Sequence, residues 1–317
     1  MTKKESNFER NRKYWEKRQR QFVKSMDLKD NRLEKELIKA YEKTSINCLE
    51  KISIFYAKYG QDNIIEYKQL LKKLDAKELR MLIRDVEGFM QEHPQYKHLT
   101  DVRKNIYKLN RLEGLKLSVE LEQLKLTDIE RNIITQHLEQ AYSFSYNYTL
   151  ETLGYGVNFN AINSPLMEAT LNRAWANNVT YLQRIADNRL KISRWLEQDL
   201  VLHLARGETY NNIAKTFSNK FEGASIRDSR RIIRTEGTYL MNEAQAQVLE
   251  GEKFEEYVYN AILDKRTTQV CRALNGEQFK FKERQPGANF PPMHPNCRST
   301  FDIVIPTDYL LKEYAKK

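Results

Sequence analysis

Apolar residues recur every three or four positions along most of the chain, the spacing that places them on one face of an α-helix. From Leu28 to about Leu153 the sequence contains one proline and three glycines, so few residues interrupt this pattern. We expect several helices in this region. One should start at Thr127, because Glu130 three positions later completes a capping box. The breaks that we expect between the helices lie near residues 60–62, 93–94 and 125–128.

The C-terminal half repeats the helical pattern and then changes to a strand pattern. Ser164 and Pro165 follow a linker and suit the start of a helix, where serine caps and proline occupies the first turn. Helical spacing continues to about residue 250. After Gly251 apolar and polar residues alternate, which is typical of a half-buried strand. The strands that we expect are residues 257–262, 278–281 and 300–305, paired in an antiparallel sheet.

Together these patterns predict a predominantly α-helical α+β protein, with a long helical N-terminal region and a C-terminal domain of helices plus a small antiparallel sheet. We divide the chain into a basic, aromatic N-terminal arm (1–24), a helical region (25–160) and a C-terminal domain (161–317). Within that domain we expect helices over 165–250, and the sheet with a loop rich in proline, histidine and cysteine over 255–306.

Positive charge is concentrated in two segments of a chain whose net charge is +10. Residues 1–24 contain nine Lys and Arg against three Asp and Glu, and residues 264–298 contain seven against three. Two basic segments on a neutral body indicate contact with a polyanion, and nucleic acid is the most common one. A solvated surface that keeps the protein soluble explains the same charge equally well.

The N-terminal arm combines its cations with aromatic residues, among them Tyr14, Trp15 and Phe22. Aromatic rings can stack on bases while cations neutralise phosphates, so the arm is a candidate for non-specific binding of DNA. An amphipathic helix that docks on its own protein is an equally good interpretation. The cations that would contact DNA are Arg10, Arg12, Lys13, Lys17, Arg18 and Arg20.

No apolar run approaches the roughly 20 residues that a membrane-spanning helix requires. The first residues are charged and not apolar, so we expect no signal peptide. Three cysteines cannot build a disulfide framework, which fits a reducing compartment such as the cytosol of the cell that makes the protein.

The segment with the most candidate chemistry lies near the C-terminus. Five of the seven prolines fall between residues 264 and 306, and those within residues 290–296 should stiffen the loop before Cys297. Cys271, His294 and Cys297 are residue types that bind zinc, and Asp264 could supply an oxygen ligand. A Cys-x-x-Cys pair would need cysteine at Thr268. Zinc is thus the one cofactor that these residues suggest.

Two other interpretations of the same residues are open. A packed loop without metal, in which Asp264 and Arg266 brace a turn through hydrogen bonds, is favoured over the zinc site. A nucleophilic Cys-His-Asp site would need an accessible thiolate and an oxyanion site, and the sequence shows neither. Farther upstream, four arginines at residues 227–234 either bind phosphate or pair with Glu236 and nearby acids, and we favour the pairing.

The C-terminal motifs carry a resemblance to a known family. They are Asp264-Lys-Arg266-Thr267, Cys271, Leu274-Asn-Gly276-Glu-Gln-Phe279, Pro291-Pro292-Met-His294-Pro295-Asn296-Cys297-Arg298, and upstream Arg234-Thr235-Glu236 with Asn242 and Ala244. This set resembles the phage head morphogenesis family, the minor head proteins similar to the F protein of phage Mu. Many relatives carry a cysteine at the position of Thr268 and another just after Arg298, where this chain has Ser299.

The resemblance implies a minor capsid protein of a tailed bacteriophage, present in few copies inside the head and associated with the portal protein. It also implies contact with scaffold or major capsid protein and, without sequence preference, with packaged double-stranded DNA. We therefore expect a non-enzymatic virion component that acts in head assembly or genome delivery, with the host cytoplasm as its site of assembly.

Functions of other classes receive less support. A metal-dependent nuclease or a transferase carried by the phage is the main alternative, yet the sequence shows no acidic metal cluster and no phosphate-binding glycine loop. A transcription or nucleoid protein would need a helix-turn-helix motif, for which no strong pattern is present.

Overall fold

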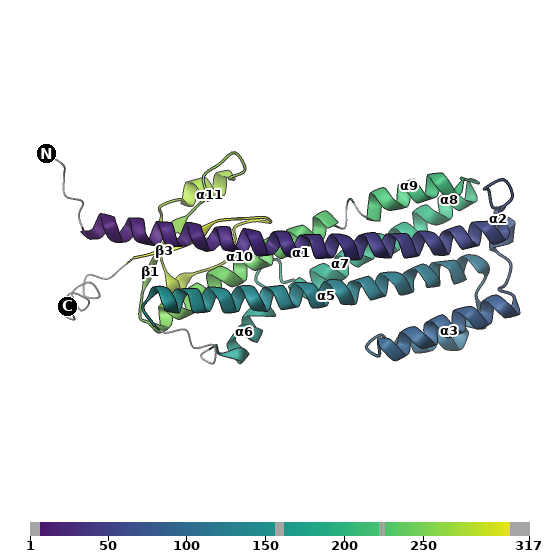
Figure 1. Ribbon diagram of the computed structural model, residues 1–317, viewed down its shortest axis with the longest axis horizontal. Helices are drawn as coiled ribbons and strands as arrows, with labels where there is room; N and C mark the ends of the chain where they lie inside the picture. Colours follow the sequence, from purple (N-terminus) through teal and green to yellow (C-terminus); the bar gives the residue numbers. More distant parts are fainter. Residues whose placement is uncertain (1–6, 156–161, 222, 224–225, 305–317) are drawn as a thin grey trace. The chain divides into compact units, whose positions relative to one another are not determined.

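The computed structural model describes residues 7–155, 162–221, 223 and 226–304 (Figure 1). It confirms a predominantly α-helical α+β protein with a small antiparallel sheet near the C-terminus. None of the helices in these ranges is both long and apolar enough to cross a membrane. The helices are α1 (Asn7–Tyr59), α2 (Tyr67–Leu70), α3 (Ala76–Glu92), α4 (Leu99–Asn105), η1 (Ile106–Lys108), α5 (Arg111–Thr152), α6 (Ser164–Leu171), α7 (Tyr181–Arg194), the π-helical η3 (Trp195–Leu200), α8 (Val201–Ala205), α9 (Tyr210–Lys220), α10 (Ile226–Gly251), α11 (Gln269–Leu274) and η5 (Phe281–Glu283). The strands are β1 (Glu256–Asn260), β2 (Gln278–Lys280) and β3 (Thr300–Ile303).

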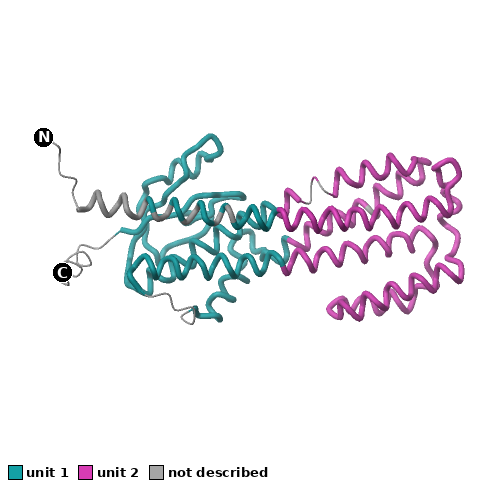
Figure 2. The backbone as a smooth tube through the Cα atoms, viewed as in Figure 1, with its two compact units in different colours: residues 1–34, 133–184, 230–317 teal, residues 35–132, 185–229 magenta. Residues whose placement is uncertain are grey.

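The chain forms two compact units, each assembled from separate stretches of sequence (Figure 2). Unit 1 consists of residues 1–34, 133–184 and 230–317, and unit 2 of residues 35–132 and 185–229. Four helices, α1, α5, α7 and α10, contribute residues to both. The units therefore interleave along the sequence, and the three predicted sequence ranges stay a prediction about independent domains.

Unit 2 is helical and contains two apolar clusters among its described residues. The larger cluster joins apolar side chains of α1, α5, η3, α8 and α9. In it the rings of Trp195 and Phe217 lie 4.9 Å apart between centroids, and those of Phe217 and Phe221 lie 5.1 Å apart. The smaller cluster packs α3 and α4 on α5. Its fully buried members include Val86 and Leu124, so α3 is held by an apolar face at helical spacing.

Side chains cap the starts of α3 and α6. α3 begins with a complete capping box, in which Asp75 accepts from the backbone amide of Glu78 and Glu78 accepts from that of Asp75. α6 begins at Ser164 as expected, but the side chain of Asn163 caps it by accepting from Leu166 N at 3.1 Å. Pro165 lies in its first turn. The cap thus lies one residue earlier than predicted.

The predicted break at residues 125–128 is wrong, because α5 continues without interruption through this region. Thr127 is inside the helix, and its hydroxyl donates to the Gln123 carbonyl one turn earlier at 2.9 Å. A capping residue needs non-helical dihedral angles. Buried leucines on both sides of Thr127 keep the segment helical, so the local capping pattern is overridden by packing. The helix α1 likewise has no break at residue 24 and runs on from the N-terminal arm.

Glu130, the other half of that predicted box, belongs to a buried polar network of unit 2. Its carboxylate accepts from the hydroxyl of Tyr41 at 3.0 Å and from the hydroxyl of Ser229. The amide Nδ2 of Asn188 lies 3.2 Å from the Tyr41 hydroxyl. Burial raises the pKa of Glu130 to about 7, although its hydrogen bonds oppose that shift. A carboxyl group in this network therefore titrates near neutral pH.

Unit 1 contains the sheet, in the order β2-β1-β3 with both pairs antiparallel. Residues 257 and 259 of β1 are buried, whereas their neighbours are half-buried, so one face of the strand covers the core. Tyr257 lies at the centre of an aromatic cluster. Its ring lies 5.1–5.8 Å from the rings of Phe279, Phe281, Phe290 and Phe301.

The helix α10 packs against this sheet through Ala246 and Leu249, which join the same cluster (Figure 1). Arg284, which follows η5, holds the adjoining loop to α10. Its guanidinium donates to Glu243 at 3.1 Å and to Glu250. A planar guanidinium can bridge two carboxylates in this way, because its five N–H donors point in fixed directions.

The raised pKa of Glu130 predicts how stability depends on pH. A folded-state pKa above the ordinary value of 4.5 means that the folded protein binds the proton more tightly than the unfolded chain. This group's contribution to stability is therefore fully present below pH 4.5 and is lost as pH rises through 7. Lowering the pH from about 8 to about 6 should raise the free energy of unfolding by about 1 kcal/mol through this residue.

Urea unfolding of the Glu130→Gln variant at the two pH values tests this prediction. The amide is neutral at both, so this part of the pH dependence should disappear. Glu151→Gln, an exposed position on the same helix, serves as the control and should keep the wild-type dependence. An unchanged pH dependence in Glu130→Gln would contradict the assignment.

Candidate functional site

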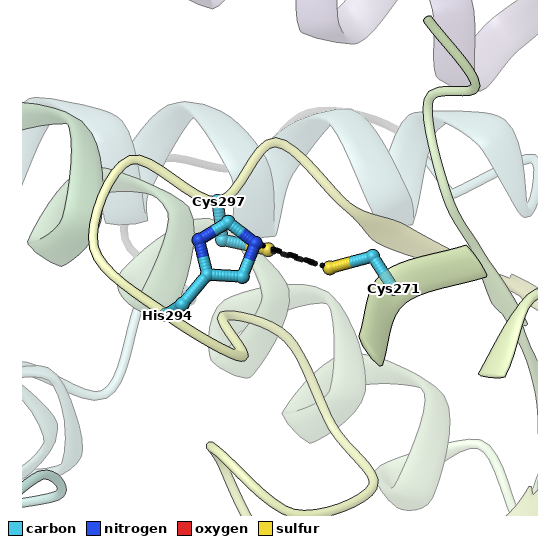
Figure 3. A group of neighbouring side chains, drawn as sticks. All are labelled: Cys271, His294 and Cys297. Atoms are coloured by element: carbon cyan, nitrogen blue, oxygen red, sulfur yellow. Dashed lines mark hydrogen bonds between the residues drawn. The ribbon is translucent and has the colours of Figure 1, made fainter. Parts of the chain in front are cut away.

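Three predicted zinc-binding residues gather in unit 1, as Figure 3 shows. Cys271 lies on α11, and His294 and Cys297 lie in the loop before β3. The Sγ of Cys271 is 3.2 Å from Nε2 of His294 and 3.8 Å from Sγ of Cys297. Both thiols are buried and His294 is half-buried. All three candidate ligand atoms lie within 4.8 Å of one another, so the residues could hold one metal ion.

Local geometry explains why Cys271 faces the loop. Thr268 caps α11 through its side chain, which accepts from the amide of Cys271 at 3.5 Å. The helix ends at Leu274, and the side chain of the next residue, Asn275, accepts from Ala261 N at 2.9 Å. Gly276 follows with φ of +90°, a conformation that glycine adopts without steric cost. These turns fix one short helix between β1 and β2, with Cys271 on its buried side.

The loop with His294 and Cys297 is docked on α10 by polar contacts. Thr235 Oγ1 accepts from the amide of Asn296 at 2.9 Å, and Thr238 Oγ1 donates to the carbonyl of Cys297 at 2.9 Å. Asn242 Nδ2 lies 3.4 Å from the carbonyl of Ser299. The three α10 residues are separated by three and four positions, so they form a polar stripe on one helix face.

A hydrogen bond sets the orientation of the imidazole. His294 Nδ1 lies 2.9 Å from the carbonyl oxygen of Pro295. A carbonyl can only accept, so Nδ1 carries the proton in this bond. In the neutral ring Nε2 then presents its lone pair, and it faces Cys271.

Two further hydroxyl groups complete the surroundings of the thiols. Tyr259 of β1 donates to Cys271 Sγ at 3.4 Å, and Ser299 hydrogen-bonds both sulfur atoms. Burial raises the pKa of Cys271, but hydrogen bonds outweigh burial and hold the pKa at about 7. The partners in those bonds are Ser299, Thr268, Tyr259 and His294.

Cys297 differs from Cys271 because burial dominates at its thiol and raises its pKa. The cluster therefore combines one thiol that is readily ionised with one that is not. Both lie inside the unit, so the sulfur atoms can take part in packing or bind an ion but are poorly placed to attack a bulky substrate.

Asp264, predicted as a fourth metal ligand, does not lie with the other three. Its carboxylate accepts from Arg298 Nη2 at 2.7 Å through each oxygen and from the amide of Arg266 at 2.8 Å. These bonds, led by the one from Arg298, lower its pKa to about 2. The hydroxyl of Thr267 donates to the carbonyl of Ile262, which closes the same turn. Asp264 and Arg266 thus stabilise this turn. The carboxylate of Asp264 is bound by the guanidinium of Arg298.

The predicted α10 residues form ion pairs, but with unexpected partners. Arg184 Nη1 lies 2.9 Å from Glu236, and Trp175 Nε1 donates to the other oxygen of Glu236 at 2.7 Å. Arg234 lies 3.6 Å from Glu34 of α1, which also pairs with Arg230. Arg230 and Arg234, two of the four arginines expected to pair with nearby acids, thus pair with Glu34. Glu236 instead pairs with Arg184, which lies outside α10.

A pocket of about 420 Å³ lies beside the Cys/His cluster in unit 1. His294 and Cys297 line it together with Thr268 and Ser299, so the cluster is within reach of small solutes. Pro292 is buried in the stiff part of the loop that shapes this wall. The other lining residues include Asp27, Asp30, Arg234, Arg266 and Arg298.

The predicted DNA-binding residues lie on the first turns of α1. Lys17 and Arg20 are exposed. The side chains of four others lie outside the described part of the structure: Arg10, Arg12, Lys13 and Arg18.

Sequence reasoning missed several residues that complete the site. Tyr259 and Ser299 contact the sulfur atoms, and Thr238 holds the loop. A signal for Thr238 was present, because Thr235, Thr238 and Asn242 are polar residues at helical spacing in the predicted helix. No local pattern marks Tyr259, since tyrosine on a strand usually indicates core packing.

Replacing the hydroxyl that holds the loop should destabilise unit 1. Thr238→Val keeps the volume but removes the hydroxyl that the Arg234 carbonyl of α10 shares with the buried Cys297 carbonyl of the loop. The free energy of unfolding should fall by about 1–3 kcal/mol in urea titrations. Thr149→Val, at a buried threonine whose hydroxyl bonds only within α5, should cost less. An equal loss in the two variants would show that the bond to the loop contributes nothing.

One comparison with known proteins gives a match, and the matched segment contains the site. The family model described as "Phage Mu protein F like protein" matches residues 195–302, which include Cys271, His294 and Cys297. The comparison with curated proteins and the comparison with solved structures each give no match. Residues 195–302 are therefore similar to the phage Mu protein F like family, and this match supports the assignment of the chain as a bacteriophage head morphogenesis protein.

Proposed function

We propose that the protein is a non-enzymatic minor head protein of a tailed bacteriophage, located inside the capsid and associated with the portal protein. The family match over residues 195–302 carries this proposal. Through the portal, the protein would act during head assembly together with scaffold or major capsid protein. Its assembly would take place in the host cytoplasm, before the finished particle forms.

The contacts of the described site support a structural role. The thiols are buried, Asp264 is held by Arg298, and Thr235 and Thr238 fix the loop to α10. A catalytic thiol needs access and a base that can take its proton, and a general base must reach its substrate. Contacts of this kind make a rigid C-terminal unit that is suited to a lasting protein–protein interface.

We further propose that the basic start of α1 contacts packaged double-stranded DNA without reading its sequence. Five cations of this segment are separated by three or four positions, which places them on one face of the helix. They are Arg10, Lys13, Lys17, Arg20 and Lys24. Of these, Lys17, Arg20 and Lys24 are described and exposed.

The length of this face suits a duplex. Fourteen residues separate its first and last cation, so the face extends for about 21 Å along the helix axis at about 1.5 Å per residue. Double-stranded DNA carries one charge for about every 1.7 Å of its axis, so several phosphates lie within that length. Each contact releases a counterion, which makes binding strongly dependent on salt but independent of sequence.

Gel-shift measurements over a series of salt concentrations test the DNA contact. Replacing Lys17, Arg20 and Lys24 together by glutamine should reduce the slope of log K against log salt by about two to three, because each phosphate contact contributes about 0.9. Affinity should fall for all duplex sequences alike. Glutamine at Lys72, Lys73 and Lys77, three exposed lysines of unit 2, removes the same charge and should leave the slope unchanged.

If the control triple variant lowers the slope equally, binding reflects total charge and not the α1 face. If the wild-type chain shifts no duplex at low salt, the DNA contact does not exist. Neither result bears on the location of the protein in the head.

Particle composition tests the head assignment separately. Gradient-purified particles of the phage that encodes this chain should contain it in few copies, and external protease should leave it intact until the heads are opened. Chemical cross-linking should join it to the portal protein. The Lys17, Arg20 and Lys24 variant should still enter the head, because the family-matched region is unchanged. Absence from purified particles, or digestion in intact ones, would refute the assignment.

A further inference from the structure

We propose that Cys271, His294 and Cys297 bind one Zn²⁺ ion as its three protein ligands, with an oxygen ligand in the fourth position. This site goes beyond the proposed function and does not depend on it. The sequence alone favoured a packed loop without metal, and the geometry of the cluster changes that balance.

The separations of the ligand atoms are those of a zinc site. With Zn–S near 2.3 Å and Zn–N near 2.0–2.1 Å, a tetrahedral ion places two sulfur atoms about 3.8 Å apart and sulfur and nitrogen about 3.6 Å apart. The two sulfur atoms here are 3.8 Å apart, and Cys271 Sγ is 3.2 Å from Nε2 of His294. Sγ of Cys297 and Nε2 of His294 lie within 4.8 Å of each other, so one ion can lie among the three atoms.

The imidazole already has the orientation that a metal ligand requires. A ligating histidine usually donates its other ring N–H to a carbonyl or carboxylate, which fixes the tautomer and ring position. His294 does so through Nδ1 and the Pro295 carbonyl at 2.9 Å. Its Nε2 lies 3.2 Å from Sγ of Cys271 and within 4.8 Å of Sγ of Cys297.

The surroundings of the sulfur atoms also fit bound metal. Thiolates that ligate zinc are stabilised by hydrogen bonds from outer groups. Tyr259 donates to Cys271 at 3.4 Å, and Ser299 bonds both sulfur atoms. A divalent ion would balance two thiolates, so the buried cluster would carry no net charge and would avoid the cost of burying unpaired anions.

The fourth position belongs to oxygen in this chain. Thr268 and Ser299 carry hydroxyl groups at the cluster, and both line the 420 Å³ pocket together with His294 and Cys297. Either a hydroxyl or a solvent molecule from this pocket can complete the tetrahedron. Three strong ligands bind zinc less tightly than four. A cysteine at position 268, three residues before Cys271, would supply the missing thiolate at the Cys-x-x-Cys spacing that suits zinc.

Metal analysis of the full-length chain tests the proposal. Protein produced with added zinc and purified under reducing conditions without chelator should contain one zinc per chain. Cys271→Ser and His294→Gln should each lower the affinity by roughly 100-fold or more, since loss of an outer-shell partner alone costs about 10–100-fold. Cys48→Ser is the matched control, because Cys48 is a buried free thiol of unit 2, and it should keep the full metal content.

Two further measurements keep the proposal testable if a ligand variant fails to fold. Cobalt added to the metal-free wild-type chain should produce the thiolate charge-transfer and tetrahedral absorption bands. Thr268→Cys should bind zinc at least about 10-fold more tightly, measured by competition with a chromophoric chelator. Chelator should also lower the melting temperature of the wild-type chain, because metal bound only to the folded state stabilises it.

Three outcomes would overturn the proposal. One is wild-type protein that stays essentially free of metal after reconstitution with zinc and gives no cobalt bands. Another is metal content that Cys271→Ser and His294→Gln leave unchanged in folded protein. The last is a Cys271–Cys297 disulfide in protein isolated under reducing conditions, since a bonded pair cannot serve as two thiolate ligands.

Discussion

The C-terminal unit depends on polar groups of α10 that satisfy the backbone of the proline-rich loop. Proline lacks an N–H, and a buried carbonyl without a donor is costly, so such a loop can lie inside a protein only where side chains meet its remaining groups. Thr235, Thr238 and Asn242 do this on successive turns of one helix. Because they fix the loop, Cys297 and His294 lie next to Cys271, which reaches them from the short helix α11.

The aromatic core and the cluster of thiols are connected through the strand β1. The strand β1 provides both, since Tyr257 lies at the centre of the phenylalanine cluster and Tyr259, two residues later on the same face, donates to Cys271. A strand with period-two burial thus connects apolar packing to the polar site. This continuity keeps the thiols packed inside the unit and leaves them little exposed to solvent.

The sequence predicted the features that depend on local patterns. The fold class, the three strands, the start of α6 near Ser164 and the gathering of two cysteines with a histidine follow from periodicity, breakers and residue type. The predictions from sequence were wrong where residues distant in the chain determine the contacts of a side chain. Glu130 was placed in a capping box, whereas Tyr41 and Ser229, each about a hundred residues away, bind it in the core. Asp264 was grouped with the metal ligands, although Arg298 holds its carboxylate.

Because the two units interleave along the sequence, the segment matched by the family does not coincide with either unit. Residues 195–229 belong to unit 2 and residues 230–302 to unit 1, so the stretch matched by the family takes part in both. Each part finishes its core with chain from outside the match, as Ser229 does with Tyr41. A graft of this stretch onto another protein would therefore carry two half-built cores. A protein that contains this segment must therefore also contain flanking sequence that completes both cores.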